Sequence, residues 1–295
     1  MRALSRRAFV GLFLLPATLL YGVFVVWPVL QSFQYSLYKW RGVSSHRRYV
    51  GSDNFRQLFG DANFWRSLAH NVGLLVGCGL AIMLISIAVA HGTQDERPIS
   101  RLLRSIYLFP QVISLVVVAV LWMFLYNPSF GVLVRLFEAL GLQALAFPWL
   151  GDQRTALLAV GIAFVWHQCG FYTMLFSAGL KSIPAEVSEA AELDGSVGLV
   201  RFRSITWPLL WSTKRTAIIY LVINSMNVFA LVFLMTQGGP DRATDVTLTY
   251  LYEQAFQNST FGYATSIAVA NFAAVMLLST LVLVCMRRNP TEARG

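Results

Sequence analysis

The chain has 295 residues, of which 56% are hydrophobic and 13% charged, and its formal net charge is +9. A mean hydropathy of +0.59 and apolar runs too long for buried core helices exclude a soluble enzyme and indicate an integral membrane protein. The positive charge does not indicate a nucleic-acid partner, because the Arg and Lys residues are scattered over the expected loops and do not gather on one helix face.

Six apolar runs are each long enough to cross a membrane, since a helix of about 20 residues spans the roughly 30 Å hydrocarbon layer. Each run is continuous and does not alternate with a period of two, so helices are expected and barrel strands are not. The expected fold class is an all-α integral membrane protein, with a six-helix domain over residues 9–288. The expected spans are residues 9–34, 68–92, 105–127, 155–180, 214–236 and 262–286.

The N-terminal sequence SRRAFVGLFLLP contains Ser5, Arg6, Arg7 and Phe9, which are typical of a twin-arginine export signal. The apolar run continues through Trp27 without a small-residue cleavage site, which is too long for a signal sequence. A retained first helix is therefore expected, with the paired arginines as anchors on the inner side.

The positive residues also predict the orientation of the six spans. With the N-terminal segment 1–8 and the tail 289–295 inside, 14 of the 23 Lys and Arg residues fall in inner segments. The loop between the first two spans opposes this assignment, because it carries six positive residues between Lys39 and Arg66. We expect both termini to be cytoplasmic and this first loop to be outside.

The energy source for any transport is constrained by what the spans lack. None of the six expected spans contains an Asp or Glu, the residue with which an ion-coupled carrier commonly binds its ion at mid-membrane. No glycine-rich GxxxxGK segment precedes any of the three lysines either. Active transport by this chain would need energy from a partner, through a surface that the partner can push.

Residues 181–213, a mostly polar segment between the fourth and fifth expected spans, have the features of such a surface. The proline before Ala185 predicts a short helix over Ala185–Leu193. Gly195 is placed to end that helix in a left-handed turn, and Ser196 to cap a second short helix that runs to Thr206. On composition alone, a solvated amphipathic linker is the alternative.

The string EAAELDG (189–195), followed by ITWPLL (205–210), resembles the EAA loop of permease subunits in bacterial ABC importers. Trp207 stands where leucine is usual, and an aromatic ring still supplies an apolar contact. The resemblance implies that the loop docks into a cleft on the ATPase. The residues that it assigns to this coupling are Glu189, Ala190, Ala191, Asp194, Gly195, Phe202, Ile205 and Pro208.

Four further segments are similar to the carbohydrate-importer branch, and the last of them to the first of two paired permeases, the maltose and glycerol-3-phosphate type. They are residues 49–71, 107–133, 177–195 and 234–256. The resemblance implies the fold of a type I ABC importer permease with cytoplasmic coupling helices, placed as a multi-pass protein in the bacterial inner (cytoplasmic) membrane.

The resemblance also implies the partners of the chain, which would form half of the translocation pathway for a sugar, polyol or sugar phosphate. They are a sister permease, two copies of an ABC ATPase, an extracytoplasmic solute-binding protein or lipoprotein, the sugar and the lipid bilayer. ATP and Mg²⁺ would be bound by the ATPase, and this chain would carry no cofactor, no metal and no catalytic residue.

Polar side chains within the fourth and fifth expected spans are candidates for the solute pathway, because such groups must be paired in lipid. They lie beside aromatic residues, and a sugar presents both hydroxyls and C–H faces. Taken singly, each polar residue is more typical of an interhelical hydrogen bond than of a ligand. The candidates are His167, Gln168, Phe171, Asn224, Ser225 and Asn227.

Two segments are expected outside the membrane on the side opposite the coupling loop. GGPDRATD (238–245) predicts a turn in which Thr244 caps a helix through about Phe256. GVLVRLFEALGL (131–142) predicts an amphipathic helix along the membrane surface.

Two alternatives stay open. One is an ABC importer permease for a non-carbohydrate solute, such as an amino acid or peptide. The other is a membrane enzyme that uses His46, His70, His91 or His167, although these four histidines are scattered without metal-binding spacing.

Overall fold

The structure, a computed structural model, describes residues 6–44, 46–95 and 97–288. Most of the expected segment 1–8, including Ser5 of the twin-arginine hypothesis, and all of the expected tail 289–295 lie outside the described residues. The chain divides into two compact units. The first contains the described residues up to Phe64 with Leu251–Phe272, and the second contains Trp65–Tyr250 with the described residues from Ala273.

The first unit begins with one long apolar helix, which the sequence predicts as the first span. Its apolar window is not buried against any described part of the chain, so lipid or another protein must cover it. The unit also holds the two strands of an antiparallel hairpin, which the all-α expectation did not include. Its elements are α1 (Arg6–Tyr21), η1 (Gly22–Val26), α2 (Trp27–Tyr35), β1 (Tyr38–Lys39), β2 (Arg48–Tyr49), α3 (Asp53–Gly60) and η5 (Glu253–Gln257).

Side-chain hydrogen bonds hold the first unit together around the hairpin. Asn54 of α3 is buried and donates from Nδ2 to the carbonyl oxygen of Ser36 across 2.7 Å. The Tyr263 hydroxyl donates to Asp61 Oδ2 across 2.5 Å. The second bond joins residues 202 positions apart in the sequence, so this unit combines the early part of the chain with the segment Leu251–Phe272.

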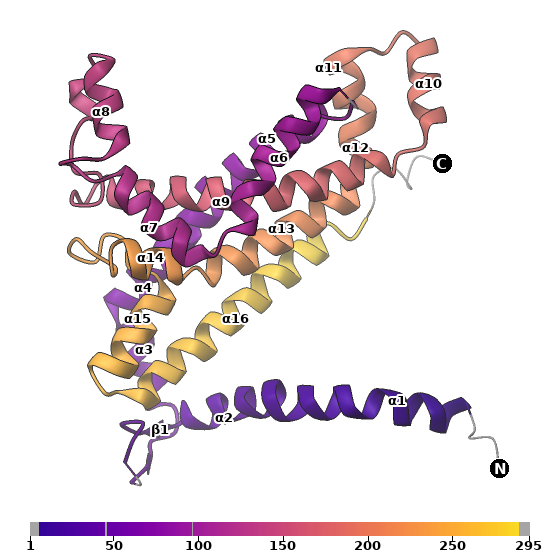
Figure 1. The fold of residues 1–295 in the computed structure, drawn as a ribbon. Coiled ribbons are helices and arrows are strands. Elements are labelled where there is room, and N and C mark those ends of the chain that lie inside the picture. Colours follow the sequence, from indigo (N-terminus) through magenta and orange to yellow (C-terminus); the bar gives the residue numbers. More distant parts are fainter. Residues whose placement is uncertain (1–5, 45, 96, 289–295) are drawn as a thin grey trace. The chain divides into compact units, whose positions relative to one another are not determined.

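The second unit is a bundle around the long helix α9, with α5, α6 and α13 running along it (Figure 1). Its core is apolar, and Tyr172, Phe176 and Leu231 are among its largest fully buried side chains. Its elements are η2 (Leu74–Cys78), α5 (Gly79–Gly92), α6 (Pro98–Val112), α7 (Leu115–Leu125), α8 (Val132–Ala139), η3 (Gln143–Leu145), α9 (Ala156–Lys181), α10 (Ala185–Leu193), α11 (Gly198–Arg201), η4 (Phe202–Thr206), α12 (Trp207–Leu209), α13 (Trp211–Met226) and α14 (Ala230–Met235). Three helices continue from one unit into the other: α4 (Ala62–Gly73), α15 (Thr247–Tyr252) and α16 (Phe261–Cys285).

Small residues allow α9 to approach its neighbours closely. A Cβ atom on Gly170 would lie 2.5 Å from the carbonyl oxygen of Tyr107 in α6, and one on Gly161 would lie 2.9 Å from Cys78 Sγ. Neither distance is possible for a real side chain. Glycine at these positions therefore sets the helix spacing, as small residues commonly do where helices pack in a membrane.

The segment expected as the third span, 105–127, is not one helix. The axes of α6 and α7 differ in direction by 103°. Ile113 and Ser114 between them are extended, with ψ values of 139° and 137°. The length of the apolar run predicted one span and did not reveal the break. Pro110, which has no backbone N–H to donate, already weakens the last turn of α6.

The remaining expected spans are long apolar helices. Within the described residues, five helices are long and apolar enough to cross a membrane, or six if the bent pair α6 and α7 counts as one span. The five are Val10–Tyr35, Ala62–Gly92, Ala156–Lys181, Trp211–Met235 and Phe261–Cys285.

The two ends of α9 carry different structures. Helix α8 and the turn η3 precede its first residue, whereas α10 and α11 follow its last, so these pairs lie at opposite ends of the second unit (Figure 1). On α8, the apolar residues Val132 and Leu136 of the predicted amphipathic helix are exposed. These two side chains are therefore mostly left uncovered by the described chain.

The turn at residues 238–245 forms, but Thr244 does not cap the following helix. Its hydroxyl donates to the Gly239 carbonyl oxygen across 2.7 Å and hydrogen-bonds the Thr236 hydroxyl at 2.8 Å. The expectation of a Thr244 cap was wrong because these bonds within the turn engage its hydroxyl. The helix begins at Thr247 and continues through η5, close to the expected end.

Candidate functional site

The loop between α9 and α13 contains four short helical segments, and the first of them has the predicted bounds. Helix α10 runs over Ala185–Leu193. Of the residues predicted to couple to an ATPase, Glu189, Ala190 and Asp194 are exposed, whereas Ala191 is buried. Helix α10 therefore turns one small residue toward the protein and leaves its acidic residues accessible.

Gly195 ends α10 in the left-handed conformation, with a φ of +73°, as predicted. Its N–H donates to the Glu192 carbonyl oxygen at 3.0 Å, and the Ser196 N–H donates to the Ala191 carbonyl oxygen at 2.8 Å. These are the two hydrogen bonds of a Schellman motif, which requires a left-handed residue between them. No atom lies within 4 Å of the place that a Cβ on Gly195 would occupy. Glycine is needed here for its backbone freedom and not for space.

Ser196 does not cap the next helix, and that expectation was wrong. Helix α11 begins at Gly198, with Val197 in the capping position and no side-chain cap. Gly198 is itself left-handed, with a φ of +58°, so a second turn separates Ser196 from the helix start. The Ser196 hydroxyl is buried and, within the described part of the chain, has no hydrogen-bond partner.

Polar and aromatic contacts brace the loop. Arg201 Nη1 lies 2.6 Å from Glu192 Oε1, which joins α11 to α10. Lys214 Nζ donates to the Trp207 carbonyl oxygen at 2.7 Å and lies 4.1 Å from the centre of the Trp207 ring. The Phe202 ring lies 5.1 Å from the ring of His91 in α5. A force on α10 would therefore reach the ends of α5 and α13.

Predicted coupling residues farther along the loop have a different exposure. Three of them are half-buried, and we interpret them as the side chains that pack the loop against the rest of the protein: Phe202, Ile205 and Pro208. The sequence analysis missed four exposed apolar side chains, although apolar residues among the polar and glycine residues of LDGSVGLV (193–200) could have suggested them. They are Leu193, Val197, Leu199 and Val200, whose exposed fractions are 90%, 63%, 80% and 66%.

The candidates for the solute pathway do not form a single cluster. Phe171 of α9 packs against Tyr220 of α13 with ring centres 5.3 Å apart. Asn224 Nδ2 donates to the Tyr172 hydroxyl across 3.3 Å. The structure therefore brings Phe171 and Asn224 together through two tyrosines. Tyr220 was not among the residues predicted for this pathway.

The other candidates make different contacts. His167 is half-buried and contacts the Gln168 side chain and the backbone of Ile113, at the break between α6 and α7. Ser225 is buried. Asn227 is exposed, and its Nδ2 donates to the Ile223 carbonyl oxygen of the preceding turn at 2.8 Å.

Asn71, another polar residue of an expected span, makes interhelical hydrogen bonds. Its Nδ2 donates to the Ser225 carbonyl oxygen at 2.8 Å, and its Oδ1 accepts from the Thr247 N–H at 2.9 Å. The neighbouring His70 bonds the Asp245 carbonyl oxygen at 2.7 Å. Asn71 therefore ties α4, α13 and α15 together within the second unit.

A cavity of about 980 Å³ lies along α5, α6 and α9 and has a mostly apolar wall that includes Trp122 and Trp166. None of the six predicted solute residues lines it.

The four histidines make separate local contacts. Among the residues that the structure describes, no group of three His, Cys, Asp or Glu side chains is placed to hold a metal ion.

Long apolar helices, together with a braced helical loop at one end, define a multi-pass helical membrane protein. Residues 82–289 match the model of the family described as binding-protein-dependent transport system inner membrane component. The chain belongs to this family.

Named relatives match nearly the whole chain. The probable ABC transporter permease protein YurN of Bacillus subtilis is 34% identical over 94% of this chain and 93% of its own length. The diacetylchitobiose uptake system permease protein NgcF of Streptomyces coelicolor is 34% identical over 90% of this chain and 78% of its own. The trehalose/maltose transport system permease protein MalF of Thermococcus litoralis is 31% identical over 92% of this chain and 91% of its own length.

The fold also matches a solved structure. The structure is that of a bacterial ABC transporter involved in the import of the acidic polysaccharide alginate, with a TM-score of 0.84, 21% identity and 96% of each chain covered. The predicted resemblance to ABC importer permeases and the all-α membrane fold are thereby confirmed. The chain is a multi-pass transport subunit of a binding-protein-dependent importer and not an enzyme.

Proposed function

We propose that this permease carries a sugar or sugar-like solute, and that it forms half of a pathway completed by a sister permease. The names of three relatives support the carbohydrate class, since they refer to diacetylchitobiose uptake, trehalose/maltose transport and multiple sugar-binding transport. Two copies of an ABC ATPase bind ATP and Mg²⁺, and an extracytoplasmic binding protein delivers the solute.

The coupling surface in this proposal is the exposed part of the loop, from Glu189 to Val200. The observation that carries it is the Schellman turn at Gly195, which fixes α10, with the exposed Leu193 at its end, relative to the exposed Leu199 of α11. An ATPase that contacts this surface differently in its open and ATP-closed states shifts the equilibrium between the inward-facing and outward-facing permease. The Phe202 and Lys214 contacts transmit that shift to α5 and α13.

This coupling surface sets the orientation that we propose. The loop 181–213 faces the cytoplasm because the ATPase is there, and both termini then lie on the same side as the loop. Helix α8 and the turn at 238–245 face outward, toward the binding protein. The excess of positive residues in the inner segments supports this arrangement.

In this proposal, Phe171 of α9 and Asn224 of α13 contact the solute. The aromatic rings of Phe171 and Tyr220 offer a surface for sugar C–H groups, and the Asn224 amide offers a donor and an acceptor for hydroxyls. We include four further residues in the proposed pathway because they lie on α9, on α13 or directly after α13: His167, Gln168, Ser225 and Asn227.

Uptake by the reconstituted importer tests the solute class. Proteoliposomes that contain this permease, its sister permease and the ATPase should accumulate a labelled oligosaccharide only with ATP inside and the binding protein outside. A labelled amino acid and a labelled dipeptide are the controls. Accumulation of either control at the sugar's rate would contradict the carbohydrate assignment while leaving the permease role intact.

A further inference from the structure

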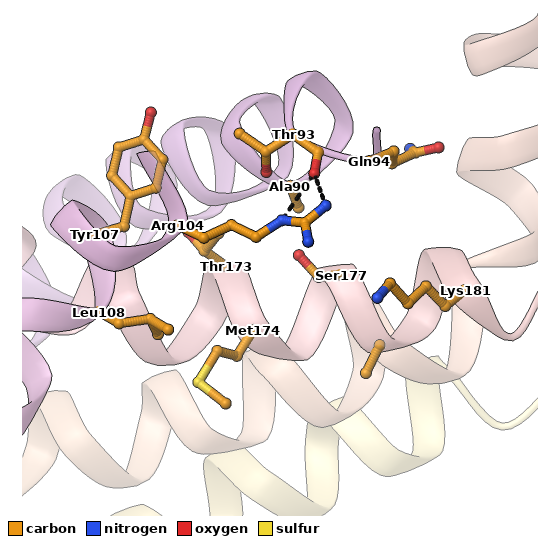
Figure 2. A pocket seen from close by; sticks show the side chains of 11 residues that line it. Ala90, Thr93, Gln94, Arg104, Tyr107, Leu108, Thr173, Met174, Ser177 and Lys181 are labelled. Atoms are coloured by element: carbon orange, nitrogen blue, oxygen red, sulfur yellow. Dashed lines mark hydrogen bonds between the residues drawn. The ribbon is translucent and has the colours of Figure 1, made fainter. Parts of the chain in front are cut away.

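A second cavity, of about 270 Å³, lies between α5, α6 and the last turns of α9 (Figure 2). Its lining is not uniform, because apolar side chains gather at one end and cationic or hydroxyl side chains at the other. The apolar end has Tyr107, Leu108 and Met174, and the polar end has Arg104, Ser177 and Lys181.

Lys181, the last residue of α9, supplies a positive charge at the polar end of the cavity. Within the described part of the chain, no carboxylate lies in salt-bridge range of its ammonium group. Figure 2 shows the amino group directed toward Ser177 at the wall of the cavity. The cation is therefore available to an anion that enters the cavity.

Arg104 is held at the same wall by backbone oxygens. Its Nε donates to the Thr93 carbonyl oxygen at 3.0 Å, and one of its Nη atoms donates to the same oxygen and to the Asp95 carbonyl oxygen. The Asp95 carboxylate itself accepts from Ser100 and pairs with Arg97 at 3.2 Å. These contacts fix the position of the guanidinium group.

Thr173 gives an independent sign of a ligand. It lines the cavity, its side chain is only 5% exposed, and its hydroxyl has no hydrogen-bond partner among the described residues. A buried hydroxyl without a partner is uncommon and needs an explanation. A ligand oxygen in the cavity would supply the missing partner.

The position of the cavity along the candidate membrane helices indicates which kind of anion it binds. Lys181 ends one candidate membrane helix, and Arg104 lies in the first half of α6, which belongs to another. The polar end therefore lies at the level of lipid headgroups, and Met174, with 55% of its side chain exposed, opens toward the hydrocarbon. An anionic headgroup with an attached acyl chain matches both ends, whereas a soluble anion matches only one.

We infer that this cavity binds the phosphate of an anionic phospholipid, with Lys181 and Arg104 at the phosphate and the acyl chain beside Leu108 and Met174. With the orientation proposed above, this lipid belongs to the inner leaflet, and that placement rests on the proposed function. The site itself does not, since its residues and contacts are the same in either orientation.

Lipid retention by the full-length chain tests the site. The purified, delipidated chain is incubated in detergent with phosphatidylglycerol, phosphatidylcholine or glycerol phosphate, and bound molecules are counted by native mass spectrometry. Wild type should retain phosphatidylglycerol preferentially. Lys181→Gln should lower that retention about fivefold, the effect expected for one basic residue at a lipid surface. Lys181→Arg should restore it.

Two further variants separate the site from general effects. Arg203→Gln removes an exposed cation of η4 that does not line the cavity, and it should retain lipid like wild type. Thr173→Val keeps the side-chain volume, removes only the hydroxyl, and should lower retention less than Lys181→Gln does. Arg104 is not substituted, because its bonds to Thr93 and Asp95 support the chain between α5 and α6.

The inference would be overturned if Lys181→Gln and Arg203→Gln retained equal amounts of phosphatidylglycerol while their unfolding temperatures were unchanged. Retention of glycerol phosphate as strong as that of phosphatidylglycerol would overturn the lipid assignment, because it would indicate a site for soluble phosphate esters. The assay needs neither the ATPase nor a solute. A negative result therefore leaves the proposed transport function untouched, and failure of that function leaves this result valid.

Discussion

The backbone N–H of Ser196 donates to the carbonyl oxygen of Ala191 across 2.8 Å, and this bond closes α10 around Gly195. The closure requires a left-handed residue, which costs an ordinary L-residue roughly 1–2 kcal/mol. Gly195→Val should therefore disorder the end of α10 and lower solute-stimulated ATP hydrolysis, while insertion of the permease is unchanged. The measurement is ATPase activity of the purified importer with and without the loaded binding protein.

Gly195→Asn is the matched control for that variant. Asparagine adopts the left-handed conformation more readily than valine, and a Cβ atom at this position meets no other atom within 4 Å. Gly195→Asn should keep most of the stimulated hydrolysis. Similar activity for the valine variant and wild type would show that the turn has no role in coupling.

Glu189→Lys should prevent the ATPase from copurifying with the permease. The residue is exposed on α10, so the substitution reverses a charge on the proposed docking surface without a cost in packing. Glu138→Lys is the control, because Glu138 is also exposed but lies on α8 at the opposite end of the second unit. Full ATPase recovery with Glu189→Lys would remove this residue from the interface.

Asn71→Ala should destabilise the protein instead of impairing transport specifically. The substitution removes the hydrogen bonds of Asn71 to the buried Thr247 N–H and to the Ser225 carbonyl oxygen. An unsatisfied buried group costs about 1–3 kcal/mol. A lower unfolding temperature and less recovered protein are expected, with a normal uptake rate per folded molecule. Normal stability with reduced uptake would place Asn71 in the solute pathway.

The parts of the fold that depend on local signals could be predicted from the sequence. Apolar length indicated the long helices, and the proline before Ala185 together with Gly195 indicated the bounds of α10 and its turn. These signals act within a few residues, where backbone sterics decide the outcome.

The parts that depend on distant partners could not be predicted. Asn71 and Thr247 are 176 positions apart in the sequence, and no local pattern relates them. The Ser196 and Thr244 caps failed for a different reason, because nearby turn geometry at Gly198 and a nearby hydroxyl at Thr236 determined the local structure instead. The break at Ile113 lay inside a run that was long enough to predict one span, and the length of a run does not locate a bend within it.

Cysteine labelling should settle the orientation. Val43, in the first loop, is 95% exposed, and Leu199, in the coupling loop, is 80% exposed. In a variant without Cys78, Cys169 and Cys285, a membrane-impermeant maleimide should label Val43→Cys in intact cells or spheroplasts but not Leu199→Cys. Both should react after lysis when the permease is expressed without the ATPase. The reverse pattern would place the coupling loop outside and contradict the docking proposal.

Asn224→Ala should lower solute uptake, and Tyr172→Phe shows whether the lost group is a solute contact. Asn224 donates to the Tyr172 hydroxyl at 3.3 Å, and Tyr172 is fully buried, so only Asn224 can reach a solute. Loss of one hydrogen bond worth about 1 kcal/mol should lower the uptake rate about fivefold.

Tyr172→Phe breaks the same interhelical bond but keeps the amide, and it should transport at close to the wild-type rate. The measurements are uptake, binding-protein affinity, basal ATP hydrolysis and unfolding temperature, and the last three should stay near wild type for both variants. Equal losses of uptake in the two variants, with lowered unfolding temperatures, would mean that the Asn224–Tyr172 bond joins α9 to α13 and that the solute passes along another surface.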